Sequence, residues 1–297
     1  MLYLTPTKKG IGVEIWGTYE DLDGLYDVIG KFWNQEQYHN VKGFENRDKL
    51  ISGFSYEIRK AKEGSRDQRE SSHFSLEQAT HYGTKTSWVH LLFSLSAIKH
   101  NMQFYATTKL DVSMLLQLEF WLERAMNEFD EIGAKNLVGY IENGLDGANA
   151  FSYQYMQSIH IDYVQLGGGK RAFRKLPELL MRSVFFTEEY KEYRDFLEKE
   201  AKRLQCSISD LEIDDDHIAI LVADVAGKGI PGSIVMTETR ALFKSEAKRS
   251  LSPLETLVRV NRTLYEDIKR GMFVTVFYMI LNIPRNILQI TSSGHNP

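Results

Sequence analysis

The feature that most constrains this chain is an apolar run that ends in an aspartate and a glycine-rich turn. Residues 217–223 read His-Ile-Ala-Ile-Leu-Val-Ala, and Asp224 follows directly. Glycines then alternate with other residues before a segment that contains Ile234, Val235 and Met236. A short apolar run that ends at glycine is typical of a buried strand, and the apolar residues beyond the turn suit a helix. This order predicts an α/β segment near the carboxyl end.

The position of Asp224 suits a hard cation, although this pattern alone does not establish a site. A carboxylate at a strand end beside glycines, with carbonyl oxygens nearby, can hold Mg²⁺ or Mn²⁺. An aspartate before glycine is also ordinary turn chemistry. The segment is not a Walker A loop, because Gly229 rather than Ser or Thr follows Lys228, and Val222 stands where the first glycine would be.

Four sequence blocks resemble the SpoIIE-like branch of the PPM-type serine/threonine protein phosphatases. They follow the order and approximate spacing of that family, within about residues 212–297. The blocks are Ala223-Asp-Val-Ala-Gly-Lys-Gly-Ile-Pro-Gly232, Asn261-Arg-Thr-Leu-Tyr, Met272-Phe-Val-Thr-Val-Phe-Tyr278 and Ser293-Gly-His-Asn-Pro297. The resemblance implies a partial αββα sandwich over this part of the chain.

The resemblance also implies a chemistry. In the family, aspartates hold Mn²⁺ or Mg²⁺ ions, and a metal-bound water attacks the phosphorus of a phosphoserine or phosphothreonine. By the match, Asp224 is a bridging metal ligand and the backbone carbonyl of Val225 assists. Phe273 and Phe277 are expected to pack in a core strand, and His295 is expected to have a structural role in its turn. The match assigns no catalytic residue.

Two family motifs have no counterpart in the sequence. An upstream Gly-Gly-Asp strand supplies another metal aspartate in the family, but counting back from Asp224 reaches Cys206, with Asp210 nearby and out of step. The later Ser-Asp-Gly and Asp-Asp motifs do not occur before Pro297. We therefore expect an incomplete phosphatase domain whose activity stays open. The remaining nearby acids are expected to be surface charges: Asp214, Asp215, Asp216 and Asp267.

The first part of the chain predicts strands and helices in mixed order. Residues 10–17 have the Val, Ile and Trp content of a strand, and Thr18 is a plausible N-cap for the helix that follows. Residues 54–60 alternate in character and predict another strand. Residues 61–80 are polar and predict a mobile loop. Residues 88–98 are mostly apolar, with Ser and His between, and over residues 88–101 periodicity alone leaves a buried helix and a buried strand both open.

Two long helical regions follow. The clearest helix is predicted over residues 111–132, with Asp111 as N-cap, a continuous apolar stripe and Gly133 at its end. A second helical region is predicted over residues 176–204, broken near Thr187. The triple glycine that starts at Gly167 is expected to mark a boundary.

These elements predict a mixed α+β protein in three parts. Residues 1–166 form an α+β domain of sensory or regulatory type, residues 167–205 a helical connector, and residues 206–297 the partial phosphatase domain. Residues 1–205 show no family that we identify. Their histidines have no metal-ligand spacing and are expected to be surface or satisfied core residues: His39, His73, His81, His90, His100 and His160. The basic cluster Arg171, Arg174 and Lys175 is short and followed by acids.

Charge and cysteine content limit the setting. The net charge is -4 and the pI is about 6.1, which gives no general reason to bind nucleic acid or an anionic membrane. The single cysteine, Cys206, excludes an intramolecular disulfide and favours a reducing cytoplasm. No apolar run reaches the length of a membrane span.

Three functional hypotheses remain. The leading one is a bacterial signalling protein resembling a metal-dependent phosphatase, which acts on a phosphoprotein regulatory partner. The second is a non-enzymatic interaction protein defined by its amino-terminal domain, with the phosphatase-like part a fragment or fusion. The third is an uncharacterised enzyme within residues 1–205, which no cluster of candidate catalytic residues supports. An incomplete sandwich leaves an exposed sheet, which favours pairing with another chain and therefore a homo-oligomer.

Overall fold

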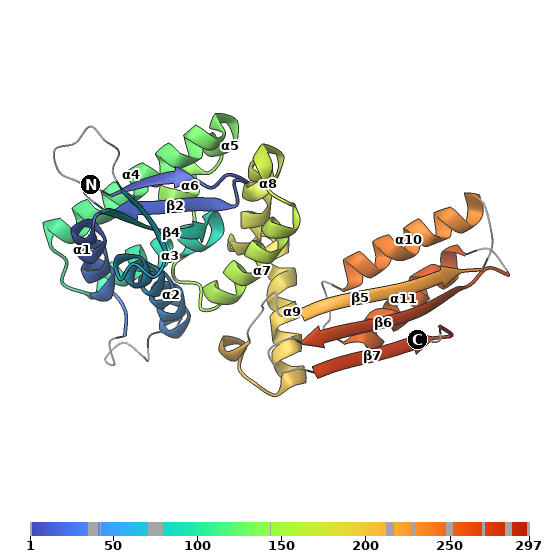
Figure 1. Ribbon diagram of the computed structural model, residues 1–297. Helices are drawn as coiled ribbons and strands as arrows, with labels where there is room; N and C mark the ends of the chain where they lie inside the picture. The colour runs from blue at the N-terminus through green and yellow to red at the C-terminus, as the bar shows by residue number, and fades with distance from the viewer. Residues whose placement is uncertain are drawn as a thin grey trace. The chain divides into compact units, whose positions relative to one another are not determined.

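The chain divides into two compact units, Met1–Ile213 and Asp214–Pro297, in a computed structural model (Figure 1). The structure describes residues 2–34, 41, 43–70, 80–142, 144–211, 217–226, 230–247, 252–268, 271–282 and 287–295. Each unit contains both helices and strands, so the predicted α+β class is confirmed. No helix among these residues is both long and apolar enough to span a membrane.

The sheet of the first unit is antiparallel, with strand order β1-β2-β4-β3. Its strands are β1 (Tyr3–Pro6), β2 (Gly12–Gly17), β3 (Asp67–Glu70) and β4 (Thr80–Ser87). β2 confirms the strand predicted over residues 10–17. Side chains alternate across a strand, so Leu4, Val13 and Ile15 share one face, and all three are buried. This apolar face forms one wall of the core.

Gly10 joins the sheet to the helices at the β1–β2 turn. Its carbonyl oxygen accepts hydrogen bonds from Trp88 Nε1 at 2.9 Å and from the Tyr163 hydroxyl at 2.6 Å. Its φ is +64°, and an added Cβ would lie 1.9 Å from Cζ of Phe129. Only glycine meets both conditions at this position.

The first helix begins as predicted. α1 (Tyr19–Gly30) starts at the N-cap Thr18, whose hydroxyl accepts from Asp21 N at 3.3 Å. Thr18 N donates to Asp21 Oδ2 at 3.0 Å, which completes a capping box. Leu22, Leu25 and Ile29, which recur at helical spacing in α1, are fully buried.

The predicted strand over residues 54–60 is wrong, because this segment lies inside the helix α2 (Phe44–Lys62). Phe54, Tyr56 and Ile58 alternate with polar residues, which imitates a strand. In the structure Phe54 and Ile58 are buried at helical spacing, whereas Tyr56 is 46% exposed. The Tyr56 ring is covered by the guanidinium of Arg59, at 5.3 Å from the ring centroid. Tyr56 is thus an aromatic residue on the exposed side of α2, and counting it as buried is what made residues 54–60 resemble a strand.

Two further predictions, for residues 88–101 and 61–80, have different outcomes. Residues 88–101, left open between helix and strand, form the helix α3 (Trp88–Asn101), with Ser87 as N-cap. The predicted loop over residues 61–80 is wrong in part, because it contains β3 and the first residue of β4. Residues 71–79 lie outside the described part.

The long helix α4 (Lys109–Phe129) begins before its predicted N-cap and ends before Gly133, which lies in α5 (Glu131–Lys135). The N-cap is Thr108, and Asp111 is the third helical residue, so the predicted cap was wrong. Asp111 Oδ2 accepts from Thr108 N at 2.8 Å, and Lys31 Nζ donates to Asp111 Oδ1 at 2.6 Å. Asp111 thus caps from inside the first turn.

Four more helices complete the first unit: α6 (Val138–Glu142), α7 (Ser152–Gln165), α8 (Gly169–Leu180) and α9 (Glu188–Leu204). Short 3₁₀ turns lie at η2 (Met102–Phe104), η3 (Met181–Ser183) and η4 (Ile208–Asp210). The break near Thr187 is confirmed, since Thr187 is the N-cap of α9. Leu176, Leu180 and Leu197 are fully buried in the same core as the strands, so residues 167–205 lie within this unit.

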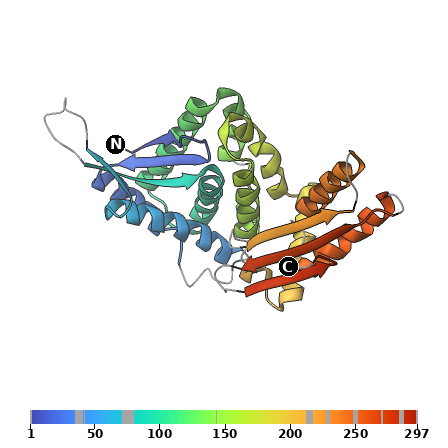
Figure 2. The same cartoon turned by 45° about the vertical axis from the view of Figure 1, so that its right-hand side comes forward.

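The second unit is one antiparallel sheet with helices on one face. β5 (His217–Val225), β6 (Val274–Asn282) and β7 (Ile287–Ser293) follow the order β5-β6-β7. The helices α10 (Ile230–Glu246) and α11 (Pro253–Asp267) lie on the same side of this sheet in both views (Figures 1 and 2). Phe243, Val260 and Leu264 from the helices pack with Val276 and Tyr278 of β6.

Candidate functional site

Asp224 lies near the end of β5 on the sheet face that the helices leave uncovered. Alternation places Ile220, Val222 and Asp224 together on one face, where Ile220 is 42% and Val222 45% exposed. Leu221 and Ala223 point the other way and pack against the core of the unit. The Asp224 side chain is exposed, so its carboxylate is accessible from solvent.

One threonine, Thr275, contacts both the backbone of Asp224 and the ring of His295. Thr275 of β6 is the register partner of Asp224, and its Oγ1 lies 3.4 Å from the Asp224 carbonyl oxygen. Thr275 Oγ1 also lies 2.8 Å from Nδ1 of His295. Ser292 Oγ donates to the His295 carbonyl oxygen at 2.6 Å. These contacts hold His295 against β6, near the backbone of Asp224, which suits a positioning role for His295.

Sequence reasoning missed Thr275 as a neighbour of Asp224. Thr275 lies within a motif, but the motif alone does not give the pairing register. In an antiparallel pair the register decides which side chains face each other, and here β5 and β6 align Asp224 with Thr275. If β5 and β6 are assumed to pair, aligning the two motifs predicts that Thr275 is a neighbour of Asp224.

The expected packing of Phe273 is wrong, because this side chain is 60% exposed. Phe273 precedes β6, and by alternation it belongs with Thr275 and Phe277 on the uncovered face. Phe277 is partly buried on that face. The interior residues of this strand are instead Val276, Tyr278 and Ile280.

The described residues do not complete a divalent metal site. Asp224 supplies one exposed carboxylate, and Val225, the last residue of β5, is the predicted source of a carbonyl ligand. A hard cation takes about six oxygen ligands. No group of three or more His, Cys, Asp or Glu side chains suited to a metal occurs in the described part of the chain. Asp224 fits as one ligand of such a site, and its metal role stays a prediction.

The other acids named from the sequence do not join Asp224 within the described residues. Asp210 belongs to the first unit, where its Oδ2 accepts from Ser207 Oγ at 2.7 Å. Asp214, Asp215 and Asp216 lie outside the described residues, as does the side chain of Asp267.

The described histidines of the first unit pack against other rings. His90 is partly buried, with Nδ1 at 2.7 Å from Ser87 Oγ and its ring centroid 4.3 Å from that of His160. Burial, and then the nearby His160, lower the pKa of His90 to about 4. His90 is therefore neutral near pH 7, and its contact with Ser87 fits the expectation of a satisfied histidine. His39 and His73 lie outside the described residues.

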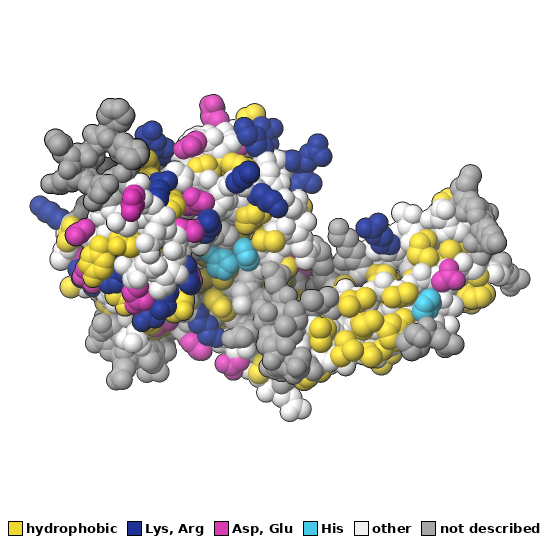
Figure 3. All heavy atoms as spheres, in the orientation of Figure 1, with side chains coloured by type: hydrophobic (Ala, Val, Ile, Leu, Met, Phe, Trp, Pro, Cys, Tyr) yellow, Lys and Arg dark blue, Asp and Glu magenta, His cyan; other side chains and the backbone are white. Residues whose placement is uncertain are grey.

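The basic cluster of α8 is partly neutralised. Arg174 donates to Asp130 through Nε at 2.8 Å and Nη2 at 2.7 Å. This bidentate pair holds the pKa of Asp130 at about 2. Figure 3 shows further Lys and Arg side chains over the α5 and α8 region, with few acids among them.

Two family models match the chain and together cover almost all of it. The model described as "Domain of unknown function (DUF6904)" matches residues 2–220. The model described as "Stage II sporulation protein E (SpoIIE)" matches residues 214–297. The amino-terminal part, in which the sequence motifs indicated no family, therefore has one. The resemblance of the carboxyl-terminal part to SpoIIE-like phosphatases is confirmed.

The curated relative that matches is the phosphoserine phosphatase RsbU of Bacillus subtilis (strain 168). It is 32% identical over 84 residues, which are 28% of this chain and 25% of the relative. The chain thus spans about a quarter of the length of that relative. No solved structure matches the chain significantly.

Proposed function

Because the chain belongs to the DUF6904 family and carries a SpoIIE-type segment, we propose that it is a bacterial signalling protein that dephosphorylates a regulatory partner. The target would be a phosphoserine or phosphothreonine on that partner. The observation that carries the proposal is Asp224 beside Thr275 and His295, within a segment 32% identical to a phosphoserine phosphatase. On this proposal the protein works in the cytoplasm, where its cysteine stays reduced.

Each residue of this cluster has a defined part in the proposal. Asp224 would give its carboxylate to Mn²⁺ or Mg²⁺, with the Val225 carbonyl as a second donor. When bound, such an ion activates water and stabilises the charge that develops on a transferring phosphoryl group. Thr275 and His295 would hold the end of β7 against β6 through the 2.8 Å contact between them. The Asp224 carboxylate would then stay accessible on the uncovered face. Among the described residues, Asp224 is the carboxylate that this cluster offers to such an ion.

Hydrolysis of phosphoserine peptides in the presence of Mn²⁺ tests this function, with Asp224→Asn as the diagnostic variant. Asparagine keeps the size of the side chain but lowers its affinity for a hard cation. We expect Mn²⁺-dependent hydrolysis to fall to background in this variant. Asp210→Asn is the matched control, since Asp210 is an exposed aspartate of the first unit and should leave the rate unchanged. Equal rates in the unaltered chain and in Asp224→Asn would contradict the proposal.

A second candidate is a non-enzymatic interaction function, favoured by the uncovered sheet face of the second unit. Ile220, Val222 and Ile290 on this face are 42%, 45% and 53% exposed. Exposed apolar surface of this kind is typical of a protein contact. A chain that hydrolyses no phosphoester, but binds a phosphoprotein equally well with and without Asp224→Ala, would favour this candidate over the first.

A further inference from the structure

The helix α4 carries an apolar stripe that faces away from the core of its own unit. Val112, Leu116 and Phe120 recur every four residues and are 41%, 58% and 55% exposed. Residues four apart lie on one side of a helix. The opposite side of α4 is buried through Leu115, Leu118 and Leu122. Three large apolar side chains in a row, spanning about 12 Å of helix, are unusual on a monomer surface.

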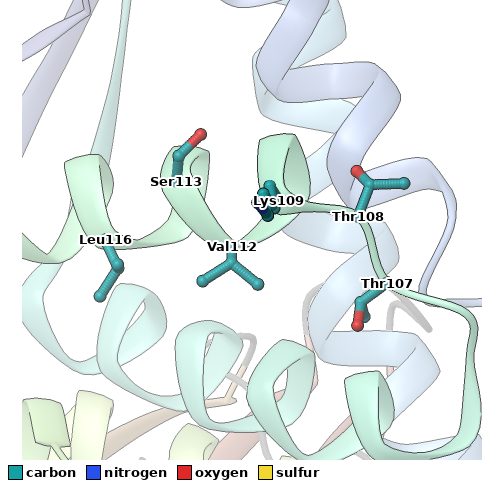
Figure 4. A pocket seen from close by; sticks show the side chains of 6 residues that line it. All are labelled: Thr107, Thr108, Lys109, Val112, Ser113 and Leu116. Carbon is teal, nitrogen blue, oxygen red and sulfur yellow. The ribbon is translucent and has the colours of Figure 1, made fainter.

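A hollow adjoins one end of this stripe. It has a volume of about 390 Å³ and is lined by Thr107, Thr108, Lys109, Val112, Ser113 and Leu116. Val112 and Leu116 leave the same side of α4, and Thr107 lies before its first turn (Figure 4). The other end of the stripe presents Phe120, a large exposed side chain. One helix face thus carries both a hollow and an aromatic side chain that could fill one.

We propose that this stripe is the contact surface of a symmetric dimer, in which α4 packs antiparallel against α4 of a second copy. With Leu116 on the twofold axis, Val112 of one copy faces Phe120 of the other, because each lies four residues from Leu116. Each Phe120 then enters the hollow beside Val112 of its partner, twice by symmetry. A self-complementary patch of this kind is what an isologous interface requires.

The charges beside the stripe fit the same arrangement. Lys109 and Glu123 each lie seven residues from Leu116, on opposite sides, so antiparallel packing brings Lys109 of one copy to Glu123 of the other. Within its own unit Glu123 lies near Glu119 and Glu142, and burial together with these two carboxylates raises its pKa. Glu119 is already engaged by Lys99 at 2.7 Å. A lysine from a second copy would relieve the repulsion at Glu123.

The mass of the chain in solution tests the dimer. Sedimentation equilibrium should give twice the 34.3 kDa of one chain. Leu116→Lys places two like charges on the twofold axis, so the dissociation constant should rise at least about tenfold. The matched control is Leu110→Lys, because Leu110 is 63% exposed on the same helix but lies off the stripe. This control should keep the dimer. Thermal unfolding of each variant verifies that it is folded.

Charge reversal tests the antiparallel geometry. Lys109→Glu and Glu123→Lys should each weaken the dimer, and the two changes together should restore it. A monomeric mass up to ~100 μM would overturn the proposal. A dimer that survives Leu116→Lys would also overturn it, as would equal weakening of the dimer by Leu116→Lys and Leu110→Lys. A double charge-reversal variant that dimerises more weakly than either single variant would contradict the antiparallel geometry. None of these outcomes depends on phosphatase activity, so the dimer and the proposed function stand or fall separately.

Discussion

His90 shows how one side chain makes the stability of the first unit depend on pH. The pKa of His90 is about 4 in the folded chain, against about 6.5 for an ordinary histidine. Protonation is therefore easier in the unfolded chain, so the stabilising contribution is present above pH 6.5 and is lost as the pH falls towards 4.

We expect the free energy of unfolding to drop by about 2 kcal/mol between pH 7 and pH 5 because of His90. Urea denaturation at the two pH values measures this drop. His90→Asn keeps a polar atom near Ser87 but does not titrate, so it should remove the His90 part of the difference and leave that of His100, whose pKa is also lowered by burial. Asp130 does not interfere, because its pKa of about 2 lies below this range. A variant with the same pH dependence as the unaltered chain would refute the assignment.

Residue roles could be predicted from sequence where they depend on neighbours in the chain. Thr18 was identified as an N-cap because capping is local. Asp111 was misplaced by three positions, since Thr108 and Asp111 both have capping side chains and only the backbone shows which one leads. Asp224 was found through its motif, but Thr275 was missed because its role comes from strand pairing.

At the scale of elements, α2 shows where a short pattern misleads. A window of seven residues, 54–60, alternates as a strand does, while the longer span that includes Leu50, Ile51 and Ala61 has helical spacing. A window of two or more helical turns would have separated the two readings. α3 is buried over most of its length, so the few polar residues in its sequence leave only a weak period to be read.

Gly53→Ala tests whether α2 is a helix in solution. Gly53 is exposed in the middle of α2, and an added Cβ would meet nothing within 4 Å. Alanine should raise the free energy of unfolding by roughly 0.5–1 kcal/mol, because it restricts the unfolded chain and favours helix. Thermal or urea unfolding measures the change. Gly10→Ala, at a position with positive φ and no space, should destabilise. Loss of stability in Gly53→Ala would argue against the helix.

At the scale of the whole molecule, the division of the chain follows its cores. The first core contains residues from Leu2 to Leu211, and the last residues of this unit are tied back to its helices. Lys49 Nζ donates to the Ser209 carbonyl at 2.8 Å, and Gln154 Nε2 donates to that of Leu211 at 3.0 Å. From the sequence we predict the boundary at residue 205, near the end of a helix, whereas the first unit extends to Ile213. The contacts of Ser209 and Leu211 join residues far apart in the chain, so the sequence pattern does not reveal them.

Residues 1–213 should therefore fold alone. Expressed without the second unit, they should unfold in one cooperative transition and keep the circular dichroism of a helix-rich fold. The shorter chain 1–205 lacks Ser209 and Leu211 and should be less stable. Equal stability of the two chains would show that these contacts contribute nothing, and a chain 1–213 without cooperative unfolding would contradict the unit itself.

More of the second unit than of the first could be predicted from the sequence, because its motifs resemble those of a family with a known fold. The predicted strand and helix are confirmed as β5 and α10, whereas residues 227–229 of the predicted turn lie outside the described residues. What the motifs did not give is the exposure of one sheet face, where Ile220, Val222 and Phe273 meet solvent. Motif matching finds residues that are shared with a family, whereas exposure depends on what is packed against them.

Isothermal titration of the whole chain with Mn²⁺ tests the central claim most directly, with Asp224→Ala as the comparison. The account predicts saturable binding by the unaltered chain that is lost in the variant, because Asp224 is the exposed carboxylate at the proposed site. Absence of binding by the unaltered chain, or equal binding by both, would contradict a metal-dependent role for Asp224 and would move the search for function to the first unit.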